Sequence, residues 1–170
     1  AIEEALRRMN IKYKIVGGLS FYQRKEIKDL MAYLRFTINT NDEQSFKRII
    51  NYPKRGIGNS SVDKIIVAAN DHGIPLWEVL ENASSFLPGR SANAVQDFVT
   101  MIKRFQLEIK KQDAYEATSQ IAKSSGILRE LYADKTVEGL NRYENVMELL
   151  NAVKEFTDDE EKEDKSMGSF

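Results

Sequence analysis

The stretch YPKRGIGNSS, residues 52–61, carries the residues of this chain best suited to hold an anion. Two glycines flank one apolar residue directly before a predicted helix, so the backbone can bend and point several N–H groups outward. The N-terminus of a helix bears partial positive charge and binds phosphate through such amides. Lys54 and Arg55 add full charges beside them, while Ile57 can turn inward as an anchor. The pattern fits a site that binds the DNA backbone without contacting bases. It fits equally well an ordinary turn between helices with a solvated Lys-Arg pair.

A second set of cations and aromatic rings lies in FYQRKEIKDLMAYLR, residues 21–35. Its cations recur at helical spacing, with acidic residues beside them as ion partners. Phe21 and Tyr22 at the helix start could stack on bases while Arg24 and its neighbours hold phosphate. The pattern favours the simpler alternative, in which both rings cover the start of the helix as a hydrophobic staple.

Motifs for catalysis are absent from the sequence. It contains no GxxxxGK[ST] phosphate loop, no GxSxG and no HExxH. Because there is no cysteine and His72 is the single histidine, disulfides, thiolate metal sites and a histidine zinc site are excluded. The sequence therefore predicts a segment with no catalytic activity, cofactor or metal of its own.

The charge of the chain is distributed unevenly. Residues 1–55 hold 12 Lys and Arg against 6 Asp and Glu, whereas residues 56–157 hold 11 against 14 and residues 158–170 hold 2 against 6. The basic end fits a surface that meets phosphate on one side, because attraction to nucleic acid follows the local potential rather than the net charge of −1.

Composition indicates a soluble globular protein. Hydrophobic residues make up 42% and charged residues 30%, and no apolar run approaches the roughly 20 residues of a membrane span. The start of the chain, AIEEALRRMNIKYK, is too charged for a secretion signal, and it lacks an initiator Met. We therefore expect a cytoplasmic protein without a membrane partner, and a chain cut from something longer.

The spacing of apolar residues predicts a mainly α fold. Helices are predicted at residues 2–9, 24–38, 43–51, 59–70, 76–80, 91–111, 114–123, 127–132 and 137–156. Asp42 and Asp113 are predicted caps, as is one of Asn59, Ser60 and Ser61. The β-rich segment 12–16 before Gly17 and Gly18 predicts one strand, and the acidic residues 158–170 predict a linker or a disordered tail.

Two segments, residues 11–36 (IKYKIVGGLSFYQRKEIKDLMAYLRF) and residues 46–58 (FKRIINYPKRGIG), closely resemble the UvrD/PcrA/Rep family of superfamily 1 DNA helicases. RYENVMELL at 142–150 resembles the later RxxNxxEL helix, and AIEEALRR looks like the end of motif IV. The resemblance implies a helix-strand-helix strip of the RecA-like domain 2A at 1–38, a multi-helix accessory subdomain 2B at 39–157, and the acidic tail at 158–170.

The resemblance also implies roles for individual residues. In this family the 2B subdomain swivels between orientations and touches duplex DNA ahead of the junction through its GIG turn. The implied duplex-backbone residues are Lys54, Arg55, Gly56, Ile57, Gly58, Asn59, Ser60 and Ser61. Arg24 matches the motif IVa arginine expected near single-stranded DNA. Glu26, Lys28 and Asp29 are expected to organise the 2A surface, and Arg142, Asn145 and Glu148 to form structural contacts in the last helix.

The implied parent is an ATP-dependent 3′ to 5′ DNA helicase for repair or replication. ATP and Mg²⁺ would bind to the rest of that parent, and the partners of this segment would be DNA and the remaining helicase domains. Two alternatives stay open. In the first, the segment is a protein-interaction or autoinhibitory module that docks through the acidic part after Gly58. In the second, the parent is a helicase-nuclease of the RecB or AddA type.

Overall fold

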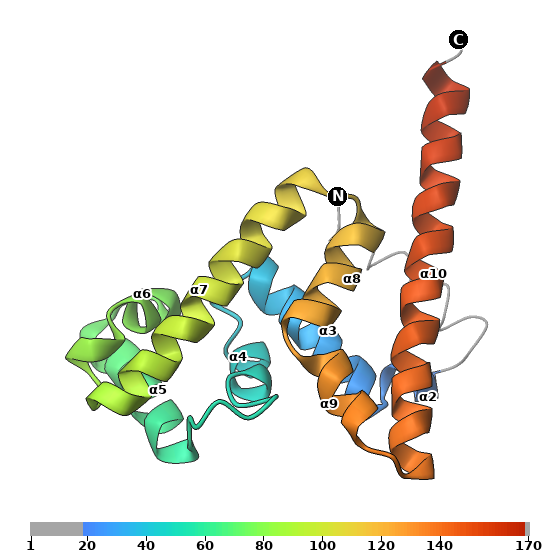
Figure 1. Cartoon of the computed structure of the whole chain (residues 1–170). Coiled ribbons are helices and arrows are strands. Elements are labelled where there is room, and N and C mark those ends of the chain that lie inside the picture. Colours follow the sequence, from blue (N-terminus) through green and yellow to red (C-terminus); the bar gives the residue numbers. More distant parts are fainter. Residues whose placement is uncertain (1–18, 169–170) are drawn as a thin grey trace. The chain divides into compact units, whose positions relative to one another are not determined.

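The computed structural model describes residues 19–168, with the side chains of residues 21–159. Every regular element in this range is a helix, which confirms the predicted mainly α fold (Figure 1). The predicted helix at 2–9 and the predicted strand at 12–16 lie outside the described residues. Within the described range, no helix is both long and apolar enough to cross a membrane.

The helices follow one another through short connections. Their bounds are α2 (Leu19–Tyr22), α3 (Lys25–Ile38), α4 (Glu43–Ile49), α5 (Asn59–His72), α6 (Leu76–Glu81), the 3₁₀ turn η1 (Ala83–Ser85), α7 (Gly89–Lys111), α8 (Ala114–Ser124), α9 (Ile127–Ala133) and α10 (Val137–Gly168). The helices predicted from residue 24 onward are all present, most of them within two residues of the predicted bounds. Two predicted caps are confirmed, because the Asp42 and Asp113 side chains accept the N–H groups of Ser45 and Glu116.

The described chain forms two compact units. One contains residues 31–107, and the other contains the described residues up to Leu30 together with those from Glu108 onward. These units do not coincide with the predicted division at residues 38 and 157. That division into a 2A segment and a 2B subdomain stays a prediction, since much of the 2A segment lies before residue 19.

The core of the 31–107 unit is built around Phe36. Its ring lies 5.9 Å from the rings of both Phe46 and Phe98 and 6.0 Å from that of Trp77, measured between centroids. The three phenylalanines are essentially inaccessible to solvent. Such aromatic clusters bury large apolar areas and favour tilted or edge-on contacts. They join α3, α4, α6 and α7. Helix α5, which follows the candidate site, packs against α6 in the same unit.

In the other unit, α8 and α9 pack against α10 (Figure 1). All three helices contribute buried aliphatic residues to the core of this unit, among them Ile121, Ile127, Val146, Leu149 and Val153. Asp134 and Thr136 organise the start of α10: the Asp134 carboxylate accepts the N–H and hydroxyl of Thr136, whose Oγ1 accepts the N–H of Gly139 at 3.0 Å. This arrangement caps the N-terminus of the helix that completes the core of this unit.

The residues after 157 are helical as far as Gly168, because α10 continues to that residue, so this stretch is not disordered. Its role as a linker stays a prediction. The sequence from 140 to 167 contains neither glycine nor proline, and its acidic and basic residues include many good helix formers. Low hydrophobicity therefore coincides here with a helix rather than with an irregular chain.

Candidate nucleic-acid interface

The segment between α4 and α5 forms a tight bend, which we call the RGIG turn (Arg55–Gly58). Gly56 has φ of +78°, a left-handed conformation that a glycine adopts without strain. A Cβ added to Gly56 would meet no atom within 4 Å, so the demand for glycine is conformational rather than steric. After this reversal the chain enters α5 at Asn59.

The start of α5 carries no side-chain cap. The N-cap is Gly58, with φ −83° and ψ 173°, so the prediction that Asn59, Ser60 or Ser61 caps this helix is wrong. The first N–H groups of a helix have no partner within the helix. Among residues 19–168, no protein acceptor lies within hydrogen-bond distance of the N–H groups of Gly58, Asn59 and Ser60. These amides therefore remain available to an external anion.

Exposed residues include those that carry these amides and a cation four residues before them in the sequence. Lys54, Gly58, Asn59 and Ser60 are all exposed, and we call these four residues the outer face. Ser61 is half-buried and its hydroxyl donates to the Ser91 hydroxyl at 3.3 Å, which places it at the edge of this surface. The outer face combines one flexible cation with the positive end of a 14-residue helix, and this is the chemistry that holds a phosphate.

Two side chains hold the RGIG turn from within. Ile57 is 1% exposed and lies in the core, as the sequence predicted. The Oδ1 atom of Asn51 accepts the N–H groups of Arg55 at 2.8 Å and of Ile57 at 3.2 Å. Because alternate amides of the turn face inward onto Asn51, the turn is fixed by polar contacts as well as by the buried isoleucine.

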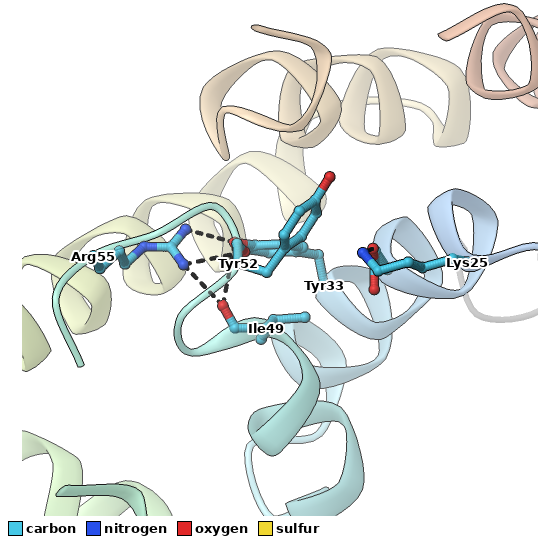
Figure 2. A network of polar contacts seen from close by, with 6 residues as sticks. Lys25, Tyr33, Ile49, Tyr52 and Arg55 are labelled. Atoms are coloured by element: carbon cyan, nitrogen blue, oxygen red, sulfur yellow. Dashed lines mark hydrogen bonds and ion pairs between the residues drawn. The ribbon is translucent and has the colours of Figure 1, made fainter. Parts of the chain in front are cut away.

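The Arg55 side chain also faces the protein rather than solvent (Figure 2). Its Nη1 atom donates to the carbonyl oxygens of Ile49 at 2.8 Å and Tyr52 at 3.2 Å, with longer contacts to those of Ile50 and Pro53. Its Nη2 atom donates to the Tyr33 hydroxyl, which in turn donates to the carbonyl oxygen of Tyr52. The guanidinium thus occupies the C-terminal carbonyl groups of α4 and the residues that follow it.

Aromatic rings complete the surroundings of this guanidinium. Its carbon lies 5.3 Å from the centroid of the Phe98 ring and 5.7 Å from that of Tyr33. Cation–π attraction of this kind is strongest where the cation is shielded from water. The sequence had placed the Arg55 charge beside the amides of the outer face, whereas the structure places it among carbonyl oxygens and aromatic rings.

Arg24 lies in the other unit, just before α3. It is exposed, its Nη1 atom donates to Oδ1 of Asn145 on α10 at 2.6 Å, and its guanidinium carbon lies 5.4 Å from the centre of the Phe21 ring. The amide group of Asn145 in turn donates to Glu26 at 2.9 Å, and the Glu26 residue is 5% exposed. Phe21 is buried, as expected if it covers the start of the helix. Arg24 is therefore outside the unit that carries the RGIG turn.

Sequence reasoning missed Asn51 and Tyr33 as parts of the site. Asparagine side chains often bond backbone amides a few residues onward, so an asparagine just after a helix and four residues before Arg55 was a usable signal. Tyr33 gave no such signal, because it lies 22 residues before Arg55 on α3 and reads as a core aromatic. The structural role expected of Asn145 is confirmed by its contacts with Arg24 and Glu26.

Other kinds of site find little support in the described part of the chain. No group of three or more acidic or histidine side chains there could hold a metal ion. An open groove of about 670 Å³ runs along α5 from Ser60 to His72, and Phe86 also lines it. Asp63, Lys64 and Asp71 line it, so its charges are mixed.

Known proteins similar to this chain share a family. The model of the UvrD-like helicase C-terminal domain matches residues 1–169. DNA helicase II of Salmonella typhimurium is 35% identical over 96% of the chain, and the ATP-dependent DNA helicase PcrA of Bacillus subtilis is 36% identical over 99% of it. The chain spans 23% of the length of each of these relatives. Since the family model covers nearly every residue, this chain belongs to the UvrD-like helicase C-terminal domain family.

Proposed function

We propose that this chain is a regulatory subdomain that binds duplex DNA within an ATP-dependent helicase moving 3′ to 5′. The relatives are named DNA helicase II and ATP-dependent DNA helicase PcrA, which supports a motor protein acting on DNA as the parent. ATP and Mg²⁺ would bind to other parts of that parent, and unwinding would serve repair or replication. The role of this segment is to hold the duplex.

The observation that carries the proposal is the outer face. Three consecutive amides at the start of α5 have no protein acceptor among the described residues, and Lys54, four residues before Gly58, is exposed. Contacts of this kind fix a protein on the sugar-phosphate backbone without reading sequence. We therefore expect binding that is independent of sequence and weakens steeply as salt rises.

A glycine-to-asparagine change at each end of α5 tests this assignment. In Gly58→Asn, the side-chain oxygen can accept the free N–H groups near the helix start, which improves the cap by a few tenths of a kcal/mol and competes with phosphate. We expect duplex affinity in the full chain to fall several-fold, with no loss of stability. Fluorescence anisotropy with a labelled duplex at low salt measures the affinity.

Gly73→Asn is the matched control. Gly73 follows the last turn of α5 in a left-handed conformation with φ of +61°, where asparagine is the best-tolerated replacement, and a Cβ there has open space. This variant should bind DNA as the wild type does. Equal affinities of the two variants would reject the outer face as the binding site.

One observation favours docking of a protein partner as a second function. The groove along α5 contains Val67, whose side chain is 53% exposed for a large apolar residue. A partner retained by the wild-type chain but lost with Val67→Glu, together with no DNA binding at low salt, would favour docking over the duplex contact. The Val67→Glu variant should leave duplex affinity unchanged if the outer face is the site.

A further inference from the structure

We propose that Arg55 is a positioning residue for the outer face and not a phosphate ligand. Together with Asn51 and Tyr33 it forms an inner network, defined by these three side chains, that keeps the amides at the start of α5 facing outward. The inference rests on the proposed function of the outer face. It assigns the two adjacent cations, Lys54 and Arg55, to opposite tasks.

The first argument is the occupancy of the guanidinium. An arginine has five N–H donors, and those on both terminal nitrogens of Arg55 already have acceptors: backbone carbonyls for Nη1 and the Tyr33 hydroxyl for Nη2. Turning Arg55 toward a phosphate would take the charged donor from these acceptors and remove the cation from the Tyr33 and Phe98 rings. These charged hydrogen bonds are partly buried and contribute more than a solvent-exposed ion pair, so the inward state is favoured.

The second argument concerns the charge that Arg55 covers. The last carbonyl groups of a helix bear partial negative charge, and those of Ile49 and Ile50 end α4 only a few residues before the outer face. Left uncovered, these oxygens would repel a phosphate bound nearby. Arg55 neutralises them, so it favours anion binding without touching the anion.

The third argument is the direction of the backbone. Asn51 takes the N–H groups of Arg55 and Ile57, and the Arg55 side chain holds the carbonyl groups of Ile49 and Tyr52 on either side of Asn51. Residues 49–57 are thus held by side-chain contacts at both the amide and the carbonyl groups. The amides of Gly58, Asn59 and Ser60, which follow this held segment, have no protein acceptor among the described residues.

Salt dependence separates a positioning residue from a ligand. A lysine that neutralises one phosphate adds about 0.9 to the slope of log affinity against log salt. We expect Lys54→Gln to reduce the magnitude of that slope by about this amount. Arg55→Gln should lower duplex affinity about 10-fold or more while leaving the slope at its wild-type value. An equal slope loss in the two variants would overturn the proposal.

Tyr33→Phe provides a second variant that changes no charge and preserves the core ring. It removes the hydroxyl that joins Arg55 to the carbonyl of Tyr52. We expect it to lower affinity about 2- to 10-fold with an unchanged slope, because one hydrogen bond of the inner network is lost. If Arg55→Gln does not fold, Tyr33→Phe still tests whether the inner network positions the outer face. An affinity of Tyr33→Phe equal to that of the wild type would then overturn the proposal.

Hydrogen exchange gives a readout that does not depend on DNA. The Ile57 amide, held by Asn51, should exchange about 10-fold faster in Arg55→Gln and measurably faster in Tyr33→Phe, because the network that orients Asn51 is weakened. Exchange at the wild-type rate in both variants would overturn the positioning role. If the wild-type chain fails to bind duplex DNA, the proposed function is rejected, while the exchange rates still decide whether the inner network positions the turn.

Discussion

The RGIG turn and the contact between α3 and α10 each contain an arginine, and the two arginines are held very differently. Arg55 donates to several carbonyl oxygens and a hydroxyl, and its guanidinium is in cation–π contact with two aromatic rings. Arg24 is exposed. Among the described contacts its guanidinium has one amide oxygen as acceptor, and it lies over the Phe21 ring. The same residue type is thus committed to the fold in one region and accessible to solvent in the other.

The difference shows what decides whether an arginine can bind DNA. A guanidinium whose donors already have buried acceptors must break those bonds before it contacts phosphate, whereas an exposed one exchanges only water and a weak partner. The number of protein acceptors that a guanidinium already contacts therefore indicates better than its proximity to a glycine-rich turn whether the arginine can bind phosphate. By this criterion Arg24 is the better candidate for a direct nucleic-acid contact, and that role stays a prediction.

The largest expected effect separates the two arginines by stability. Arg55→Gln should lower the free energy of unfolding by about 2–4 kcal/mol, because buried carbonyls and the Tyr33 hydroxyl lose a charged donor. Arg24→Gln should lower it by less than about 1 kcal/mol, because its contacts are exposed. Urea denaturation of the two variants measures both values. Equal losses would remove the distinction drawn between the two regions.

A smaller loss of unfolding free energy is expected when Asn145 is replaced. This variant tests whether the contact between α3 and α10 depends on Asn145 more than on Arg24. Asn145→Ala should cost about 1–2 kcal/mol, because the nearly buried carboxyl of Glu26 loses a donor. Asn151→Ala, at an exposed position later in the same helix, is the control and should be neutral or slightly stabilising. A loss at Asn145 smaller than that of Arg24→Gln would contradict this order of importance.

The smallest expected effect is a pH dependence at the start of α10, the helix that carries Asn145. Hydrogen bonds from the hydroxyl and N–H of Thr136 hold the pKa of Asp134 below its usual 3.8. Because the folded-state pKa is the lower one, the stabilisation is present above the unfolded-state pKa and is lost as pH falls through the folded-state value.

The comparison of the wild type with Asp134→Asn measures this contribution. The difference in unfolding free energy between the two should be constant near neutral pH and should shrink as pH falls below about 3.8. It should also remain small, because Asp134 is only half-buried and water screens its charge. A difference that does not change with pH would show that the carboxylate charge contributes nothing to the cap.

The helices were predictable because their signals are local. Apolar residues at three- and four-residue spacing gave α3 and α7, and Asp42 and Asp113 could be identified as caps from their place before each periodic run. The end of α10 was missed because low hydrophobicity was weighed as a sign of disorder, although the residues after Phe156 favour a helix. The cap of α5 was missed because polar side chains after Gly58 were preferred over the glycine itself.

The candidate site was predictable only in its outline. The turn, the inward Ile57 and the helix that follows could all be derived from the spacing of residues 52–61. The direction of the Arg55 side chain could not, because its acceptors include a hydroxyl on α3 and its ring contacts include Phe98 on α7. Such partners are brought together by tertiary packing, which a pattern within ten residues does not contain.

The positive φ at Gly56 has a consequence that concerns chirality. An L-residue is strained in this conformation, whereas a D-residue adopts it without strain. A Cβ added there would meet no atom within 4 Å. A D-alanine placed at residue 56 by chemical ligation would therefore fit the native bend while restricting the unfolded chain. At residue 56, an L-alanine would therefore strain the turn, whereas a D-alanine would make it more rigid.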